Sequence, residues 1–296
     1  TRRSPGSPRS PRASARSASA GEAAAGLGRS ALKELASRHG IRPTKRRGQH
    51  FLADPNLARA IVADADVHEG DLVLEVGAGP GSLTVPLTEA GCRGLANALR
   101  EVVAPCPNVR IEVADAMRLD WPSMLGAGRW SMVSNLPYNV SVPLVLELLE
   151  TAPAIDRYVV MVQREVGERL VAGPGAEGYG AVSVRVAYHA DARVVRRVPA
   201  DVFWPRPKID SVLVRLEPRA PAVDVDRGAL FAVVNEGFAE RRKTMANALR
   251  RLGLDPAGAT GVLRSAGLDP GARAEQLGLD GFARITETML ERGWTP

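Results

Sequence analysis

Short apolar runs alternate with amphipathic stretches along most of the chain, and this alternation predicts strands that are followed by helices. The apolar runs have the length of buried strands, whereas the amphipathic stretches repeat apolar residues every three or four positions. The predicted strands are residues 71–76, 108–113, 130–133, 157–163, 194–198 and 211–216, and the predicted helices are residues 30–39, 54–65, 82–90, 142–149, 165–171 and 181–188. This order predicts an α/β domain with a mostly parallel sheet, whose last two strands form an antiparallel pair.

The pattern becomes entirely helical after a proline-bounded linker at residues 218–221. Residues 230–247 predict one long amphipathic helix, and two shorter helices are predicted at 257–266 and 280–291. The core-facing stripe of the long helix is Phe231, Val234, Phe238 and Met245. We therefore expect two folded parts, residues 30–217 and residues 221–296, of which the second is a small helical bundle.

The first 29 residues consist largely of Arg, Ser, Pro, Ala and Gly. Such a segment buries too little apolar surface to offset the entropy lost on ordering, so we expect it to be disordered. It has the composition of a solvated tail, of an electrostatic RNA-binding tail and of a transit-like presequence, and these alternatives stay open. Five of its arginines lie in the first twenty residues without any acid, so the rest of the chain carries only +1 of the total charge of +6.

Composition excludes several classes of function. No apolar run approaches the ~18 residues of a membrane-spanning helix, so no membrane partner is predicted. The two cysteines and four histidines show no metal-ligand spacing, and we predict no metal site. The scarcity of cysteine favours a reducing compartment and therefore a cytoplasmic location.

A glycine-rich turn, residues 77–81, connects the strand 71–76 to the helix 82–90. Strand, glycine turn and helix in this order are typical of the first nucleotide-binding unit of a doubly wound sheet. Gly77 and Gly79 let a ligand approach the backbone without a Cβ in the way. Glu75, just before the turn, is typical of sites for S-adenosylmethionine, although a plain strand–turn–helix would have the same pattern.

The sequence after this unit departs from a nucleotide-binding pattern. A second strand should follow, with an acid about 20 residues past the glycines to hold the ribose hydroxyls. Residues 91–94 instead lead directly into residues 95–101, which have the pattern of a helix, and Glu101 falls inside that helical pattern. We therefore expect this strand and its acid to be missing and cofactor binding to be weak.

Two later strands end in candidate recognition residues. Asp115 and Ala116 follow the strand 108–113, where a carboxylate and the next backbone amide can pair with the edge of an adenine. Asn135, Pro137 and Tyr138 follow the strand 130–133 and place hydrogen-bond acceptors beside an aromatic ring. This arrangement suits a flat heterocycle with an exocyclic amine, whereas an ordinary turn after a strand is the alternative.

Three segments combine cations with aromatic or helical surroundings. Arg46 and Arg47 precede Phe51, and Phe203, Arg206 and Lys208 share a proline-stiffened loop with Trp204; the third group is Arg241, Arg242 and Lys243, near Arg250 and Arg251. Cations interleaved with aromatic rings suit an unstacked base and its phosphates, and a basic run suits a phosphate backbone. Solvated charged surfaces would have the same composition.

Taken together, these segments resemble the ribosomal-RNA adenine dimethyltransferase family, in its small-subunit (KsgA-type) branch. The resemblance runs from about residue 41 to residue 290. It rests on seven motifs in order: Gly48-Gln49-His50-Phe51-Leu52, residues 75–81, Asp115-Ala116-Met117, residues 135–141, Gln163-Arg164-Glu165-Val166, residues 203–211 and Arg241-Arg242-Lys243-Thr244. Seven ordered motifs are far more specific than any one of them.

The resemblance implies a Rossmann-like S-adenosylmethionine-dependent methyltransferase domain, followed by a smaller all-helical domain. The implied reaction adds two methyl groups to N6 of each of two adjacent adenines near the 3′ end of small-subunit ribosomal RNA, during small-subunit biogenesis. The implied protein is a cytoplasmic monomer whose partner is the immature small subunit.

The same resemblance assigns the site residues. The cofactor pocket would comprise His50, Leu52, Glu75, Gly77, Gly79, Asp115, Ala116 and Asn135. Asn135, Pro137 and Tyr138 would receive the target base, and Phe203 would stack on its other face. His50 stands where the family has an asparagine, and its imidazole can still donate one hydrogen bond.

Two alternatives remain open. A methyltransferase of the antibiotic-resistance type would modify large-subunit RNA, although residues 163–188 and 241–244 favour the small-subunit branch. A non-catalytic RNA-binding assembly factor that has lost its cofactor would explain the missing strand and acid.

Overall fold

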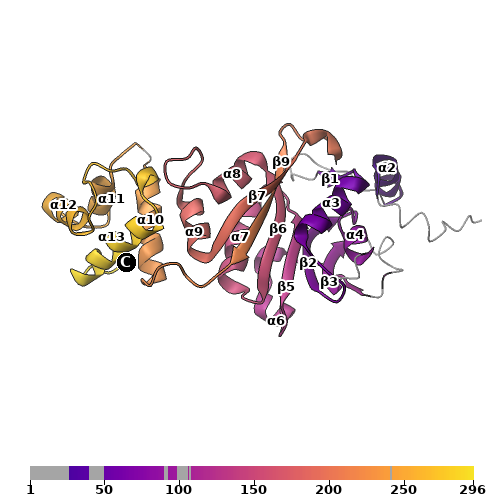
Figure 1. The fold of residues 1–296 in the computed structure, drawn as a ribbon, viewed down its shortest axis with the longest axis horizontal. Coiled ribbons are helices and arrows are strands. Elements are labelled where there is room, and N and C mark those ends of the chain that lie inside the picture. Colours follow the sequence, from indigo (N-terminus) through magenta and orange to yellow (C-terminus); the bar gives the residue numbers. More distant parts are fainter. Residues whose placement is uncertain (1–26, 40–49, 90–92, 99–105, 107, 241) are drawn as a thin grey trace, which may run out of the picture.

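The computed structural model describes residues 27–39, 50–89, 93–98, 106, 108–240 and 242–296. The predicted disordered tail and the cations Arg46, Arg47 and Arg241 lie outside the described residues, apart from the last three positions of the tail. Figure 1 shows an elongated molecule, with a twisted sheet in its centre and right half and a group of helices at its left end.

A seven-stranded sheet forms the larger part, with the strand order β4-β3-β2-β5-β6-β9-β7. Its strands are β2 (Leu72–Gly79), β3 (Arg93–Ala98), β4 (Val109–Arg110), β5 (Trp130–Asn135), β6 (Ile155–Gln163), β7 (Ala190–Val198) and β9 (Ser211–Pro218). The pairs from β4 to β6 are parallel, and β9 is antiparallel to both β6 and β7. The predicted parallel sheet with a final antiparallel pair is thereby confirmed.

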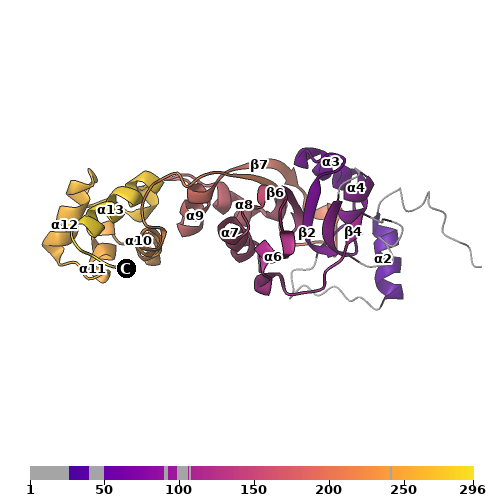
Figure 2. The same cartoon turned by 90° about the horizontal axis from the view of Figure 1, so that it is seen from below.

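Helices cover both faces of this sheet. They are α3 (Pro55–Ala65) and α4 (Thr84–Glu89) on one face, and α6 (Trp121–Leu125), α7 (Ser141–Thr151), α8 (Arg164–Val171) and α9 (Ala181–His189) on the other. Figure 2 shows α3 and α4 on the opposite side of the strands from α6 and α7. The central strands read as continuous apolar runs because both of their faces are covered.

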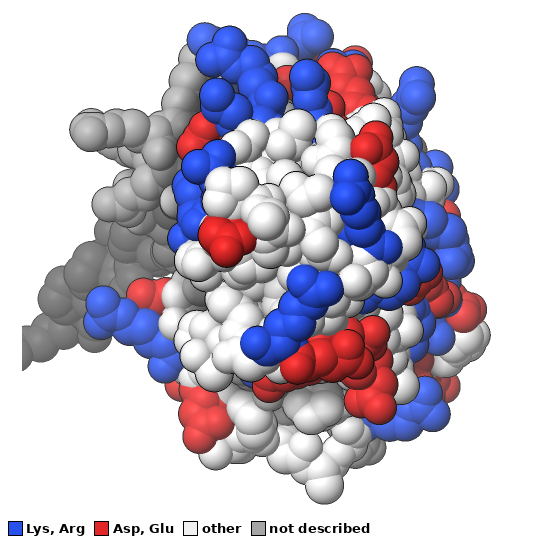
Figure 3. Space-filling view, turned by 90° about the vertical axis from the view of Figure 1, so that its left-hand side faces the viewer, with Lys and Arg blue, Asp and Glu red and all other residues white. Residues whose placement is uncertain are grey.

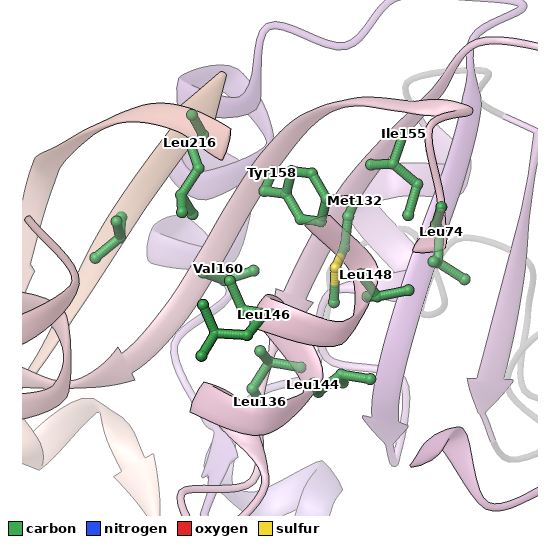
Figure 4. Packing of buried hydrophobic residues seen from close by; sticks show 14 of the residues in the cluster. Leu74, Met132, Leu136, Leu144, Leu146, Leu148, Ile155, Tyr158, Val160 and Leu216 are labelled. Carbon is green, nitrogen blue, oxygen red and sulfur yellow. The ribbon is translucent and has the colours of Figure 1, made fainter. Parts of the chain in front are cut away.

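The alternation along a single strand shows this two-sided burial. Met132 and Val133 are neighbours on β5, and both are 0% exposed, yet they belong to the cores on opposite faces. Figure 4 shows Met132 and Tyr158 packing with Leu144 and Leu148 of α7. Burial on this scale is what holds the carboxyl ends of the central strands in place.

A small two-stranded sheet lies beside the large one. It pairs β1 (Phe51–Leu52) antiparallel with β8 (Phe203–Trp204), which follows the short 3-10 helix η3 (Ala200–Val202). The N-terminal helix α2 (Arg29–Arg38) is tied to this region, since Arg29 donates to the carbonyl of Phe203 at 3.4 Å. The segment around Phe51 is therefore held against the loop before β9.

The prediction of a missing second strand is wrong. Residues 93–98 form β3, which pairs in parallel with β2 on one side and with β4 on the other. Leu95 and the alanines of this segment favour a helix locally, but pairing with β2 and β4 overrides that preference. The strand ends at Ala98 and contains no acid, and Glu101 lies outside the described residues.

The prediction of one long helix at residues 230–247 is also wrong, because two helices occupy this range. The chain forms α10 (Arg227–Ala239) and α11 (Met245–Arg251), followed by α12 (Pro256–Ser265), the 3-10 turn η4 (Ala274–Gln276) and α13 (Leu279–Glu291). Thr244 has an extended backbone before α11, and the Met245 amide donates to the Ala272 carbonyl at 2.8 Å. The predicted stripe residues nevertheless all lie in or against one core.

The C-terminal helices share their core with α9. Tyr179, Val184 and Tyr188 belong to the same apolar cluster as α10 to α13. The Tyr179 hydroxyl donates to the Leu277 carbonyl at 2.7 Å, and the Gly175 amide donates to the Glu275 carbonyl at 2.8 Å. The glycine-rich loop at 173–180 therefore joins the sheet part to the helices, while the boundary at 217–221 stays a prediction.

Within the described ranges, no helix has both the length and the apolar character that crossing a membrane requires.

Candidate active site

The candidate site lies where the strand order reverses. From β2 the chain builds outward through β3 and β4, and it then returns to β5 on the other side of β2. In open α/β sheets, ligands bind outside the carboxyl ends of the strands at such a reversal. The Val76 amide donates to Ser134 Oγ at 2.9 Å, which holds the ends of β2 and β5 together.

A cavity of about 240 Å³ opens at this point. Its wall is made of residues from β1, the glycine turn and the segment after β5: His50, Phe51, Leu52, Glu75, Gly77, Ala78, Gly79, Pro80, Ser82, Leu83, Asn135, Leu136, Pro137 and Tyr138. Three stretches that are far apart in the sequence therefore meet in one cavity.

The glycine turn is in close contact with its neighbours. Gly77 has φ +75°, and a Cβ there would lie 3.2 Å from Cδ of Pro137. Gly79 has φ +55°, and a Cβ there would lie 3.0 Å from the ring of Phe51. Any side chain at these positions would combine an unfavourable backbone conformation with a steric contact. Both glycines are needed for the shape of the cavity wall.

The side chain of Asn135 has a defined orientation. Its Nδ2 donates to the backbone carbonyl of His50 at 3.0 Å. A carbonyl oxygen can only accept, so the amide nitrogen must face it, and Oδ1 occupies the other arm of the amide. The contact with the His50 carbonyl thus points the Asn135 Oδ1, a hydrogen-bond acceptor, away from His50. Asn135 itself lines the cavity.

The ring of Tyr138 is positioned by two contacts, one through its hydroxyl group and one through a face of the ring. Its hydroxyl lies 3.1 Å from Ser211 Oγ, and its ring stacks on His50 with 5.3 Å between centroids. Burial raises the pKa of Tyr138, which keeps the phenol neutral. His50 Nδ1 lies 2.7 Å from the Pro205 carbonyl and must donate to it, so in the neutral ring Nε2 carries the lone pair.

Glu75 is a buried carboxyl group, with 5% of the residue exposed. Loss of hydration raises its pKa to about 7, although the Thr84 hydroxyl, which donates at 2.6 Å, opposes this shift. A carboxyl group with this pKa is a mixture of protonated and ionised forms near neutral pH. The sequence identified Glu75, whereas Thr84 was missed because only the start of α4 brings it under the glycine turn.

A second, smaller cavity of about 40 Å³ lies on the β4 side of Glu75 and Gly77. Its wall is made of Leu74, Glu75, Val76, Gly77, Glu112, Ala114, Ala116, Leu119, Trp121 and Met124. Ala116 therefore lines the second cavity and not the first, which contains the other predicted cofactor residues His50, Leu52, Gly79 and Asn135. Asp115 lines neither of the two cavities; its side chain is 61% exposed and accepts from the Met117 amide at 3.0 Å, at the start of η2 (Ala116–Arg118).

The position of Phe203 contradicts its predicted role. Phe203 is 0% exposed and packs in the core with Leu52, Val198 and Leu213, so neither face of its ring is available to a base. Successive side chains of an extended strand point to opposite sides, and in β8 the side chain of Phe203 points into the core. Its neighbour Trp204 is partly exposed, with its ring centroid 6.3 Å from that of Phe51.

The predicted RNA-binding cations lie in two separate places. Arg206 and Lys208 are exposed in the loop after β8, next to β1, whereas Arg242 and Lys243 are exposed before α11, at the far end of the molecule (Figure 1). A cavity of about 450 Å³ at that end is lined by Glu240, Lys243, Asn247, Arg250, Arg251, Leu254 and Pro256. Figure 3 shows basic side chains along the edges of this end.

One member of the C-terminal basic group is already paired. Arg251 forms ion pairs with Glu236 and, at 3.1 Å, with Glu240, which the sequence pattern did not place nearby. Arg242, Lys243 and Arg250 are also exposed, and they form no ion pair among the described residues. Across the described part of the chain, no group of three or more His, Cys, Asp and Glu is placed to hold a metal ion.

The chain is similar to known proteins over most of its length. The family model described as ribosomal RNA adenine dimethylase matches residues 42–290. The protein named ribosomal RNA small subunit methyltransferase A from Kineococcus radiotolerans is 43% identical over 267 residues, which cover 86% of this chain and 88% of the relative. Its namesake from Thermobifida fusca is 44% identical over 271 residues, covering 86% of this chain and 93% of the relative.

Solved structures show the same fold. A dimethyladenosine transferase from Plasmodium falciparum is 23% identical and superposes with a TM-score of 0.70, over 83% of this chain and 99% of that one. The 23S rRNA methyltransferase ErmE is also 23% identical, with a TM-score of 0.61 over 80% of this chain and 98% of that one.

Proposed function

Because the chain belongs to the ribosomal RNA adenine dimethylase family, we propose that it is a methyltransferase that acts on adenines of ribosomal RNA. The relatives are named for the small subunit, which supports N6 of two adjacent adenines near the 3′ end of that RNA as the target. The proposed donor is S-adenosylmethionine. The proposed form is a cytoplasmic monomer acting on immature small subunits.

The orientation of Asn135 is the observation that carries this proposal. An exocyclic adenine amine has two hydrogens and a lone pair that is delocalised into the ring, so it is a poor nucleophile. The Asn135 Oδ1 and the Pro137 carbonyl would accept those two hydrogens, which favours a pyramidal nitrogen with a more localised lone pair. The Pro137 carbonyl accepts from the Val140 amide at 3.1 Å and keeps its second lone pair for this contact.

The residues around the glycine turn fit the donor. Gly77 and Gly79 leave the backbone open where a Cβ would fill the cavity wall, and Glu75 and Leu52 complete that wall. When bound, S-adenosylmethionine supplies an electrophilic methyl group on a sulfonium. The chain contributes by aligning the amine with that methyl group, and positioning of this kind is worth several kcal/mol.

The ring of Tyr138 would support the target base after it leaves its stack. Extruding a base costs a few kcal/mol, and stacking on an aromatic ring offsets part of that cost. His50 stacks on one face of Tyr138 in this structure, so the base would stack on the opposite face of the ring. After transfer, the methylated ammonium is acidic and releases its proton without a dedicated base.

The RNA backbone would contact the exposed cations. We propose Arg206 and Lys208 as contacts beside the cavity and Arg242 and Lys243 as contacts at the helical end, with Arg46, Arg47 and Arg241 added from the sequence. Their charges supply affinity that does not depend on sequence, whereas the cavity supplies the choice of adenine.

Transfer of a labelled methyl group tests this function directly. The chain is incubated with labelled S-adenosylmethionine and, separately, with immature small subunits and with protein-free large-subunit RNA. We expect label only in the small subunits, in dimethylated adenine near the 3′ end. Label in large-subunit RNA would support the antibiotic-resistance activity instead, and label in neither would support a non-catalytic assembly factor.

A further inference from the structure

The second cavity has a feature that the proposed function leaves unexplained. It adjoins the first cavity through Glu75 and Gly77, so a ligand that follows the glycine turn towards β4 would enter it. The neighbouring strand β3 ends at Ala98 without an acid in the described part of the chain. The described part of β3 thus offers no carboxylate to the ribose hydroxyls of a nucleoside in this place.

Glu112 is a carboxylate in the wall of that cavity, two residues beyond the end of β4. Its side chain is 44% exposed, and its Oε2 lies 3.6 Å from Nη2 of Arg110. Exposed ion pairs at such distances contribute little, so the carboxylate can exchange this partner for a ligand at small cost. An ionised carboxylate has two oxygens that only accept, which suits a pair of adjacent hydroxyls.

The other acids near the cavity are less suited to this role. Glu75 is buried, and one of its oxygens is occupied by the Thr84 hydroxyl. Asp115 lies outside the wall and accepts from the Met117 amide. The wall also contains Trp121, whose buried indole N–H has no hydrogen-bond partner among the described residues. That N–H is itself enclosed, so of the two acids in this wall Glu112 is the accessible acceptor.

We propose that Glu112 holds the vicinal ribose hydroxyls of the methyl donor, in place of an acid at the end of β3. The inference rests on the proposed function, because it assumes an adenosine-containing donor. With this contact, the chain would hold the ribose of that donor without an acid in the described part of β3. It also makes Glu112, rather than Asp115, the residue that distinguishes ribose from deoxyribose forms of the ligand.

A thermodynamic cycle between the side chain and the ligand tests this role. Binding of S-adenosylhomocysteine and of its 2′,3′-dideoxy analogue is measured by calorimetry for the wild type and for Glu112→Ala. We expect Glu112→Ala to weaken binding of the parent ligand about tenfold or more, because it removes hydrogen bonds to a charged acceptor. The dideoxy analogue should bind both proteins with the same reduced affinity.

Arg110→Ala is the matched control, because it removes the partner of Glu112 and leaves the carboxylate in place. We expect it to bind the parent ligand at least as well as the wild type. Equal losses for both ligands in Glu112→Ala, or no loss for either, would overturn the role of Glu112 while leaving donor binding intact. A wild-type chain that binds neither ligand would overturn the proposed function and this inference together.

Discussion

The β5 side and the β4 side of the candidate site differ in how their functional groups are held. On the β5 side, Asn135 is fixed by the His50 carbonyl, Tyr138 is placed beside Ser211, and Gly77 lies against Pro137. On the β4 side, the strand has two residues, Asp115 is exposed, and Glu112 has one weak ion pair.

This difference matches the two tasks of the proposed reaction. Methyl transfer requires the amine to stand in line with the donor, and displacements of about 1 Å cost large factors in rate. Holding a nucleoside requires only that its polar groups find partners, which side chains at an exposed loop can do after binding. In the proposed reaction, the more constrained half would therefore face the base, and the less constrained half would face the donor nucleoside.

Removing the most constrained acceptor should have the largest effect. We expect Asn135→Ala to lower the single-turnover rate of methyl transfer about 10³-fold, the size seen when one fixed hydrogen-bonding group is lost from an active site. The thermal midpoint should change little, since Asn135 is only partly buried. Asn139→Ala, an exposed amide in the same turn, is the control and should retain normal turnover. A rate within tenfold of the wild type for Asn135→Ala would remove this residue from the mechanism.

The buried carboxyl group between the two halves should make stability depend on pH. The pKa of Glu75 is raised from 4.5 to about 7. Its contribution to the free energy of unfolding is therefore complete below about pH 4.5. That contribution is lost as pH rises through 7, because the unfolded chain ionises more readily. The loss is at most about 3 kcal/mol, from roughly 1.4 kcal/mol per pKa unit.

Glu75→Gln should remove most of this dependence, since an amide oxygen can still accept from Thr84. We expect the variant to be more stable than the wild type at pH 8 and to gain less at pH 5, as measured by urea denaturation. The exposed Glu69→Gln is the control for a change of charge alone. Identical pH profiles for the wild type and Glu75→Gln would show that Glu75 titrates normally.

A methyl group at the contact between the halves should disturb both. Gly77→Ala forces a Cβ to 3.2 Å from Pro137 at φ +75°, and the backbone conformation alone costs roughly 1–2 kcal/mol. We expect lower stability and a loss of donor affinity of tenfold or more by calorimetry. Gly70→Ala is the matched control, because its φ is +91° but a Cβ there has no neighbour within 4 Å. If both variants bind the donor equally well, the contact with Pro137 has no role in shaping the cavity.

The smallest effect is expected at the far helical end. Replacing Arg242 and Lys243 by Gln should weaken RNA binding several-fold at moderate salt, and it should reduce the salt slope by about two. Arg129→Gln, an exposed cation paired with Asp156 beside β5, is the control and should leave the slope unchanged. A slope unchanged by the double substitution would exclude these cations as phosphate contacts.

The strands of the central sheet were predictable because burial on both faces leaves a continuous apolar run. Residues 157–163 carry that signal, and β6 is found there with two further residues at its start. The predictions failed where local preference and tertiary pairing disagree. Residues 93–98 have few strand-forming side chains, and their place between β2 and β4 makes them a strand. Two separate helices, α10 and α11, likewise occupy a stretch whose helical pattern looks continuous along the chain.

The sequence by itself determined which chemical groups the site contains: the glycine turn after an apolar strand, the amide and ring after β5, and the acid before the turn. These follow from residue type and from position at strand ends, which local periodicity reveals. Only the tertiary structure decided their relations: that the His50 carbonyl orients Asn135, that Phe203 faces the core, and that Glu112 lies in the wall of a cavity shared with Glu75. Those relations depend on contacts between segments tens of residues apart, and the packing of the whole chain selects them.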